Sequence, residues 1–225
     1  MKSWLALLLV CLAACGDSTG TNDQFAREFA FDDSVGDTAL FAGSVGSFPA
    51  LDVRRVSGMV TTDSLTFTME FAGPVASVAD AAPNSLQATL AIDADDDGTT
   101  GTQVDSTADS TSIDSTSTDS TSSDSTKVPP FTGPFPARTG VGAEYWVFVD
   151  QLSNGAAEVR RAGTFDHVGT FPISYSGNSV TMRIPLSAIG VPAAHPFRVV
   201  GIVGTSQRLT DLIPDSSSYL LGGSS

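Results

Sequence analysis

The residues with the clearest chemical potential form one acidic stretch, DADDDGTTG, at positions 93–101. Asp93, Asp95 and Asp97 alternate along it, and Gly98 occupies the sixth place. Oxygen ligands at alternate positions followed by Gly are typical of the first half of an EF-hand-type loop, in which the ligands converge on one calcium ion. The main-chain carbonyl of Thr99 then supplies the seventh place. The stretch therefore predicts a calcium site.

The second half of the EF-hand pattern is missing. Val104 stands at the twelfth place, where the motif needs a bidentate Glu, and no helical pattern flanks the loop. Another carboxylate must close the site, and the candidates are Asp105 and Glu144. Two alternatives stay open: a solvated acidic turn whose carboxylates face water, and a catalytic pair of carboxylates.

The elements that must position this loop are predicted to be β-strands. Alternation of apolar and polar residues is clear in SLTFTMEF, LQATLAI and SVTMRIP, and it predicts antiparallel strands with one dry face. Only 75–82 and 185–190 could form short helical turns. The fold class expected is all-β, an antiparallel β-sandwich of about nine strands, with a barrel as the alternative. The nine segments are 28–31, 51–58, 64–71, 86–92, 144–149, 156–162, 170–175, 179–185 and 197–203.

A low-complexity segment interrupts this pattern. The tripeptide DST recurs five times between 105 and 126, and the Pro-rich stretch VPPFTGPFPAR follows at 128–138. So few apolar residues cannot offset the chain entropy of folding. We expect a disordered insertion, 104–138, inside a single β-sandwich domain, 25–213, followed by a tail, 214–225. A glycosylated Ser/Thr stalk is the functional alternative for the repeat.

The first residues, MKSWLALLLVCLAAC, predict secretion. The apolar run is too short to span a bilayer and is typical of a signal peptide, 1–14. Its end, Leu12-Ala13-Ala14-Cys15, resembles the lipobox of bacterial lipoproteins. That resemblance implies cleavage before Cys15, lipidation of Cys15 and a polar tether at 15–24. Gly16, rather than Asp, follows the Cys, which by the same resemblance implies anchoring in the outer membrane.

Composition excludes several classes of function. The chain carries 25 acidic and 11 basic residues, a formal net charge of −14, so a nucleic-acid partner is not expected. Of its two Cys residues, one lies in the signal peptide, so neither a disulfide framework nor a thiolate zinc site is expected. A second acidic turn, formed by Asp32, Asp33 and Asp37, is explained by turn chemistry as well as by a metal.

No motif predicts catalysis. The chain lacks G-x-S-x-G, H-E-x-x-H and a phosphate-binding glycine loop. Its only histidines, His167 and His195, fall in segments that favour exposed loops. We therefore expect no enzymatic activity, with an extracytoplasmic hydrolase as an alternative.

The order of short motifs resembles the DOMON-like and family-9-like carbohydrate-binding β-sandwich modules of bacterial surface lipoproteins. The motifs are FDDSVGDT, LDVRRVSG, LAIDADDDGTTG, GAEYWVFVD and IPLSAIG, within residues 28–205. The resemblance implies sugar binding with structural calcium. It also implies an aromatic platform, for which Tyr145 and Trp146 are candidates, although adjacent strand residues point to opposite faces. We expect a lipid-anchored, carbohydrate-binding module, with an assembly lipoprotein that contacts other envelope proteins as the alternative.

Overall fold

The computed structural model describes residues 25–34, 51–75, 85–104, 139–151, 155–205, 208–214 and 217–223. The expected signal peptide, Cys15 and its tether, the DST repeat with the Pro-rich stretch, Asp37 and Asp105 all lie outside the described residues. Within them no helix is long and apolar enough to cross a membrane.

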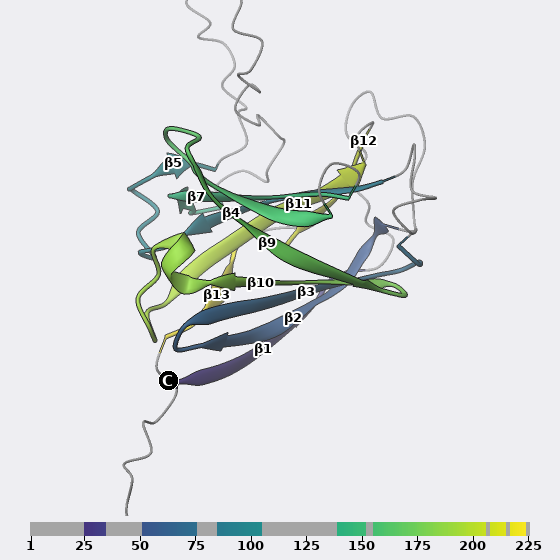
Figure 1. Ribbon diagram of the computed structural model, residues 1–225, viewed down its shortest axis with the longest axis horizontal. Helices are drawn as coiled ribbons and strands as arrows, with labels where there is room; N and C mark the ends of the chain where they lie inside the picture. Colours follow the sequence, from purple (N-terminus) through teal and green to yellow (C-terminus); the bar gives the residue numbers. More distant parts are fainter. Residues whose placement is uncertain are drawn as a thin grey trace, which may run out of the picture.

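The described residues fold almost entirely into β-strands, which confirms the all-β prediction (Figure 1). The strands are β1 Ala26–Asp32, β2 Val53–Thr61, β3 Ser64–Phe71, β4 Leu86–Asp93, β5 Thr102–Gln103, β6 Gly142–Ala143, β7 Tyr145–Asp150, β8 Ala156–Arg161, β9 His167–Ser176, β10 Ser179–Pro185, β11 Phe197–Thr205, β12 Arg208–Ile213 and β13 Tyr219–Leu221. A single turn of 3-10 helix, η2, covers Leu186–Ile189 inside the segment expected to form a helical turn. It ends at Gly190, whose φ of 66° suits glycine.

Each of the nine segments with strand character corresponds to one of these strands, and a further short strand lies beyond residue 213. Tyr219–Leu221 forms β13, which pairs antiparallel with β11. Tyr219 and Leu221 are buried in the main core, while Leu220 is half exposed. A three-residue strand shows too little alternation to be separated from a polar tail, and its pairing with β11 decides its place.

The strands form two layers that share one strand. The order is β1-β2-β3-β10-β9-β8-β7-β4-β11-β12, and every neighbouring pair in it is antiparallel. Ser176 to Ile173 at the end of β9 pair with β10, whereas its first half, from His167 to Pro172, pairs with β8. In Figure 1, β9 runs diagonally from the layer of β7, β4 and β11 to the layer of β10, β3, β2 and β1. The sheet therefore folds over on itself into a sandwich.

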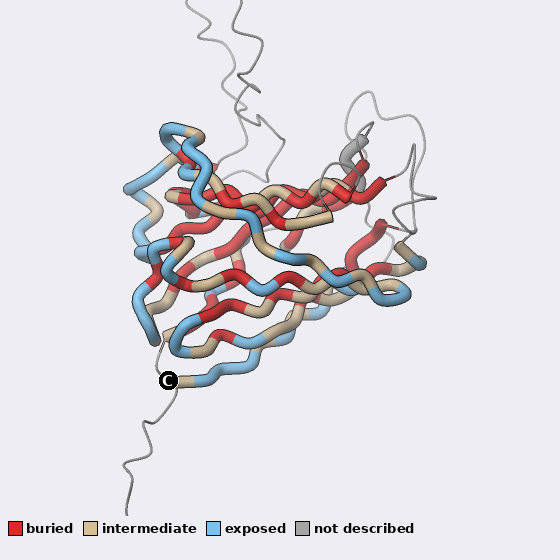
Figure 2. The backbone as a smooth tube through the Cα atoms, viewed as in Figure 1, coloured by how far each residue is buried: buried red, intermediate tan, exposed pale blue. Residues whose placement is uncertain are grey.

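The main core fills the space between these layers (Figure 2). In β3 the alternating residues Leu65, Phe67, Met69 and Phe71 are all buried, as the period-2 pattern predicts. Asp211 is also buried, and its carboxylate accepts hydrogen bonds from the main-chain N–H of Val53, at 2.6 Å, and of Leu212, at 2.8 Å. A buried carboxylate thus ties β12 to the start of β2 in the other layer.

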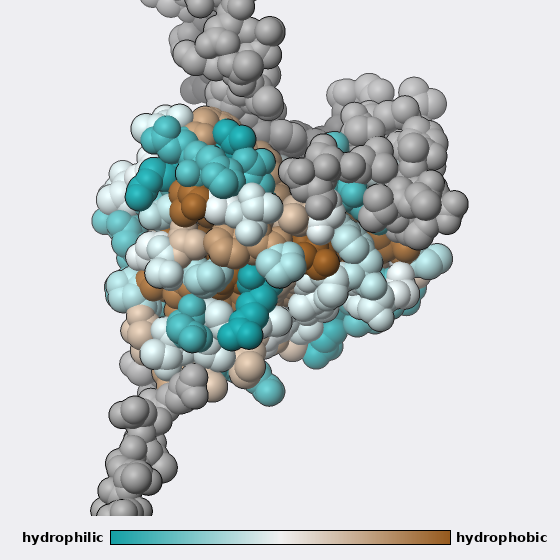
Figure 3. All heavy atoms as spheres, viewed as in Figure 1, coloured by the Kyte–Doolittle hydropathy of each residue, from teal (hydrophilic) through white to brown (hydrophobic). Residues whose placement is uncertain are grey.

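A second, smaller cluster covers the other face of the β7-β4-β11 layer. We call it the outer-face cluster; its buried members are Ala91, Val104, Val141, Ala143, Trp146, Ala162, Val200 and Ile202. Phe148, Phe165 and Leu212 pack against it and are partly buried. Because β4 lies between two apolar clusters, seven of its eight residues are buried. Elsewhere, Figure 3 shows hydrophilic side chains gathered near β5 and only small hydrophobic patches between polar ones.

Candidate functional site

The acidic loop lies where β4 ends, beside the start of β7. The two strands pair antiparallel, with Ile92 opposite Tyr145. The main-chain N–H of Glu144 donates to the Ile92 carbonyl at 3.0 Å. This pairing places Glu144 beside the loop that follows Asp93, although the two acids are 51 residues apart in the sequence. The strand pairing therefore closes the loop with a residue that lies between β6 and β7.

Three of the predicted ligands come together. One carboxylate oxygen from each of Asp93, Asp95 and Glu144 lies within 4.8 Å of the other two. Two oxygens that bind the same calcium ion at about 2.4 Å can be at most about 4.8 Å apart. The spacing of this acidic cluster therefore fits one hard cation held by three carboxylates.

Asp93 is the most deeply buried member of the acidic cluster. Its side chain is fully buried, and its Oδ1 and Oδ2 accept main-chain N–H bonds from Asp97, at 3.1 Å, and Gly142, at 3.4 Å. Burial raises the pKa of Asp93, and these two hydrogen bonds oppose the rise, while the neighbouring Asp95 adds to it. The carboxylate is thus held in place in a position that disfavours its negative charge.

Glu144 faces Asp93 and Asp95 from the β7 side. Its Oε2 accepts the main-chain N–H of Ala94 at 2.8 Å, which fixes the side chain against the loop. Burial also raises the pKa of Glu144, and the charges of Asp95 and Asp93 raise it further. A divalent cation at this place would oppose both pKa rises, because its positive charge favours the ionised form of the carboxylates around it.

Thr100 is a functional candidate that the sequence pattern did not identify. Its hydroxyl lies 3.1 Å from Asp95 Oδ2, 3.0 Å from Glu144 Oε1 and 3.0 Å from the carbonyl oxygen of Asp97. One hydroxyl proton can serve only one of these acceptors. The hydroxyl oxygen of Thr100 is therefore a further oxygen donor at the centre of the cluster, whereas the EF-hand pattern favoured Thr99.

Asp97 and Thr99 do not take the positions that the motif predicts. Asp97 Oδ1 accepts both the N–H and the hydroxyl of Thr99, at 3.0 and 2.6 Å, and these bonds lower the pKa of Asp97. The Asp97 carboxylate is not part of the close cluster. The Asp97 carboxylate stabilises its own turn through these bonds to Thr99. The bonds explain why Asp97, a ligand in the EF-hand pattern, has a role in turn formation here.

Asp96 anchors the loop to β11. Arg198 Nε donates to Asp96 Oδ1 at 2.5 Å, and Arg198 Nη1 lies 3.4 Å from the Ser218 hydroxyl. Asp96 has a φ of 57°, a conformation that Asp tolerates better than most residues. The fourth aspartate of the stretch thus has an ionic partner of its own and does not belong to the acidic cluster.

Small residues let the loop pack against β6. A Cβ on Gly142 would lie 2.0 Å from the Thr100 carbonyl oxygen, and one on Gly98 would lie 2.4 Å from the Gly140 carbonyl oxygen. Gly101, with a φ of 63°, leaves no room for a Cβ beside Glu144. The glycines on both sides of residues 105–138 therefore allow the close contact that brings the acids together.

The two predicted ligand-binding aromatics are buried on opposite faces. Tyr145 is 8% exposed in the main core, and Trp146 is 5% exposed in the outer-face cluster. Arg161 lies over the Tyr145 ring, 5.6 Å from its centroid. Their opposite orientation follows the strand period, and neither ring is exposed as an open platform for a sugar. Both rings complete apolar clusters instead.

The other polar candidates make local contacts. His167 is exposed and lies 3.1 Å from the Thr170 hydroxyl, and His195 Nδ1 lies 2.7 Å from the carbonyl of Pro196. Asp32, in the second acidic turn, forms an ion pair with Arg55 at 2.5 Å. No metal-compatible cluster other than Asp93, Asp95 and Glu144 occurs among the residues that the structure describes.

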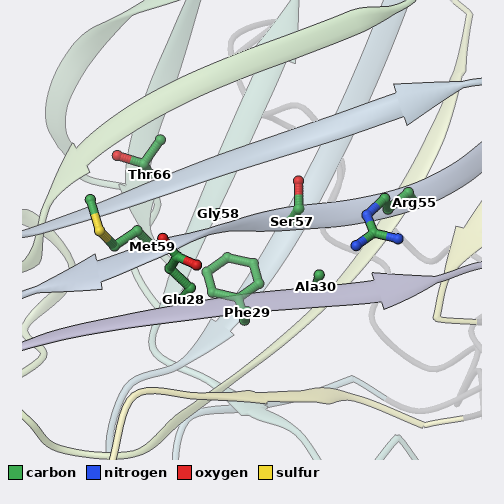
Figure 4. Close-up of a pocket in the computed structure, with 8 residues that line it drawn as sticks. All are labelled: Glu28, Phe29, Ala30, Arg55, Ser57, Gly58, Met59 and Thr66. Atoms are coloured by element: carbon green, nitrogen blue, oxygen red, sulfur yellow. The ribbon is translucent and has the colours of Figure 1, made fainter.

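A shallow groove of about 620 Å³ crosses strands β1, β2 and β3 (Figure 4). Cross-strand neighbours place Glu28 beside Met59 and Ala30 beside Ser57. The groove combines apolar side chains, hydroxyls, a carboxylate and a guanidinium, a mixture suited to a polar organic ligand. Its lining residues are Glu28, Phe29, Ala30, Arg55, Ser57, Gly58, Met59 and Thr66.

A scan against protein-family models finds no match to this chain. A search of curated proteins also finds none.

Proposed function

We propose that this protein is a lipid-anchored, non-enzymatic binding module of the bacterial envelope whose acidic loop is stiffened by calcium. The observation that carries the proposal is the approach of Asp93, Asp95 and Glu144 to within 4.8 Å of one another. Three carboxylates with one hydroxyl nearby favour a hard, oxygen-binding cation. A carbohydrate is the ligand class that the resemblance to DOMON-like and family-9-like modules favours.

Calcium is preferred over a catalytic role for these acids because of how they are held. Asp93 is fully buried and accepts two main-chain N–H groups, and Glu144 accepts a third, so the pair is fixed against the loop. The groove lies over β1, β2 and β3, away from the acidic loop at the end of β4. A structural cation is consistent with this separation, since it would order a loop without touching the ligand.

The groove over β1 to β3 is the proposed carbohydrate site. Ser57 and Thr66 offer hydroxyls, Arg55 offers donors, and Met59 offers an apolar surface that is 36% exposed. Sugars need this combination of hydrogen-bonding groups beside an apolar face. The groove replaces the Tyr145 and Trp146 platform as the candidate ligand surface.

Thermal unfolding tests the calcium part. The chain from residue 15 with Cys15→Ser is unfolded in EDTA and then in millimolar Ca²⁺. Calcium at about 100 times its dissociation constant stabilises the folded state by about 2.7 kcal/mol, which corresponds to a rise in Tm of several degrees. Asp95→Ala should remove the rise, and the exposed control Asp63→Ala should retain it. A chain whose Tm ignores calcium would make the loop a solvated acidic turn.

Binding to polysaccharides tests the carbohydrate part. We expect retention on a polysaccharide column that Arg55→Ala and Met59→Ala weaken. Arg54→Ala is the matched control, because Arg54 is the exposed neighbour of Arg55 and does not line the groove. Co-purification with envelope proteins, unchanged by the groove variants and without polysaccharide binding, would instead favour the alternative of an assembly lipoprotein.

The anchor is tested separately in bacteria. Metabolic labelling with a fatty acid should mark the wild-type protein and not Cys15→Ser, and fractionation should place the labelled protein in the outer membrane. Labelling confined to the inner membrane would contradict the expected location and leave the binding proposals intact.

A further inference from the structure

The groove over β1, β2 and β3 lies at one end of a longer row of small side chains on the outer face of that layer. Cross-strand pairing places one member of the row on each of β1, β2, β3, β10 and β9, and the members are Ala30, Ser57, Thr68, Thr181 and Ser174. Each of them is at least partly exposed, whereas their neighbours along β3 and β10 are buried in the main core. We call these five residues the central row.

Longer side chains border the central row where the groove lies. Asp32 and Arg55 pair on one side of it, and Glu28 and Met59 pair on the other. The side chains of the central row between these two pairs are short. The groove of about 620 Å³ therefore has the central row as its floor, and Figure 4 shows this end of the row with its borders.

The same order of short and long side chains continues beyond the groove. Glu70 of β3 pairs with Arg55 and extends one border, and Arg183 of β10 extends the other. Thr68 and Thr181 pair with each other between these two residues. The low central row therefore continues across β3 and β10, at right angles to the strands.

The central row presents a regular series of hydroxyl groups. Its four hydroxyl-bearing residues lie on adjacent strands, and the row crosses four strand spacings from Ala30 to Ser174, about 19 Å in all. The Oγ1 atoms of Thr68 and Thr181 lie 2.9 Å apart, so one hydroxyl donates to the other. The second proton and the remaining lone pairs stay available to a ligand. A row of this length fits a chain of sugar units better than one sugar ring.

The charges beside the central row nearly cancel. Glu28, Asp32 and Glu70 are acidic, Arg55 and Arg183 are basic, and Arg55 forms an ion pair with Asp32 at 2.5 Å. The whole chain carries a formal net charge of −14, which disfavours an anionic polymer. Charge complementarity therefore favours a ligand that is neutral and rich in hydroxyls.

A protein partner fits this face less well. Met59 is the one exposed large hydrophobic residue on β1, β2, β3 and β10, all of which lie within the part of the chain that the structure describes. The centre of a protein interface is usually apolar and rich in aromatic residues. Hydroxyls beside a single apolar side chain are instead suited to a sugar chain.

We propose that the ligand is a neutral, linear polysaccharide that lies across the strands along the central row, from Ala30 towards Ser174. Thr68 and Thr181 bind the sugar units beyond the groove and so select a chain over a single sugar. The inference rests on the carbohydrate site proposed above, which it deepens, and it does not depend on calcium.

The dependence of affinity on chain length tests the proposal. The chain from residue 15 with Cys15→Ser is titrated calorimetrically with soluble glucan, mannan and xylan, and with polygalacturonate as the anionic probe. We expect a neutral polysaccharide to bind, and its oligosaccharides to bind more tightly as they lengthen from disaccharide to hexasaccharide. Equal affinities for the two lengths, or a preference for polygalacturonate, would overturn the inference and leave a carbohydrate site in place. Binding to none of the four probes would remove the carbohydrate site and the inference together.

The double variant Thr68→Val with Thr181→Val tests the two threonines. It removes both partners of one hydrogen bond and nearly keeps their shape, so Tm should not change. The affinity for the hexasaccharide should fall about three- to tenfold, and much of the dependence on length should disappear. Arg55→Ala, in the groove, should weaken both lengths. A folded double variant with wild-type affinity for the hexasaccharide would overturn the inference without affecting the groove.

Two further variants complete the test. Thr181→Lys adds a long side chain to the central row and should reduce the affinity for the hexasaccharide to that for the disaccharide. Thr164→Val is the matched control, because Thr164 is an exposed threonine in the turn between β8 and β9 whose hydroxyl bonds to Asp166. The control should bind both lengths as the wild type does. A loss of affinity in Thr164→Val equal to that in Thr181→Lys would also overturn the inference.

Discussion

Arg198 Nε lies 2.5 Å from Asp96 Oδ1, and this ion pair separates Asp96 from the acidic cluster of Asp93, Asp95 and Glu144. The two side chains are 35% and 25% exposed, so the pair is partly screened by water. We predict that Asp96→Asn and Arg198→Ala each lower stability by about 1 kcal/mol and leave the calcium-dependent rise in Tm intact. Chemical denaturation with and without calcium measures both effects. Loss of the calcium response in Asp96→Asn would make Asp96 a ligand.

Asp97 and Glu144 should respond in opposite ways to amide substitution. Glu144→Gln should remove most of the calcium-dependent rise in Tm, because Glu144 is part of the close cluster. Asp97→Asn should retain it, since the Asp97 carboxylate bonds to Thr99. Calorimetric titration with Ca²⁺ compares the two affinities. The reverse order of affinities would restore the EF-hand-type arrangement that the sequence predicts.

The stability of the calcium-free protein should fall as pH rises through the raised pKa values of Asp93 and Glu144. Their ordinary values are 3.8 and 4.5, and burial raises both in the folded state. The folded chain keeps these protons to higher pH than the unfolded chain, so the stability that they contribute is present below the ordinary values and is lost above the raised ones. Calcium binds the deprotonated acids, so its stabilising effect should grow across the same window.

Thermal melts between pH 4 and pH 8, in EDTA and in calcium, measure this dependence. Asp93→Asn should make the EDTA profile flatter, because Asn does not titrate. An EDTA profile that rises through this window and is unchanged by Asp93→Asn would contradict the prediction.

Gly142 and Gly140 form a matched pair for the packing of the loop. A Cβ on Gly142 would lie 2.0 Å from the Thr100 carbonyl oxygen, so Gly142→Ala must displace the loop and should weaken calcium binding. Gly140 has a φ of 67° and nothing within 4 Å of an added Cβ. Gly140→Ala should therefore cost only about 1–2 kcal/mol of conformational strain and keep the calcium response. Equal calcium affinity in the two variants would separate the site from β6.

Asp211 should be important for stability. Its buried carboxylate accepts N–H groups from Val53 and Leu212, so Asp211→Ala leaves buried donors without these acceptors. We expect a loss of about 2–4 kcal/mol in the free energy of unfolding, measured in urea. The exposed Asp166→Ala, whose carboxylate bonds only locally to Thr164, should change stability by less than about 0.5 kcal/mol. A similar loss in both variants would exclude this role for Asp211.

The sequence alone determined the strands of this protein. Alternation in 64–71, 86–92 and 179–185 predicts β3, β4 and β10 closely, because side chains on a strand repeat every second residue and one face is buried. The acidic loop at 93–101 was also predictable, since Asp and Gly mark a turn after an apolar strand. Short pairings such as β13 were not, because three residues carry no period.

Only the tertiary structure decided which acids meet. Glu144 lies beside Asp93 and Asp95 because β4 pairs with β7, although the two strands are far apart in the sequence. No local sequence pattern encodes the register of that pairing. Asp97 turns to Thr99, and Asp96 to Arg198, because nearby donors are available to each of them. The burial of Tyr145 and Trp146 was also decided by the tertiary structure, because the sheet has an apolar cluster on each face. Alternation in the sequence predicts which face a side chain is on, but not whether other residues cover that face.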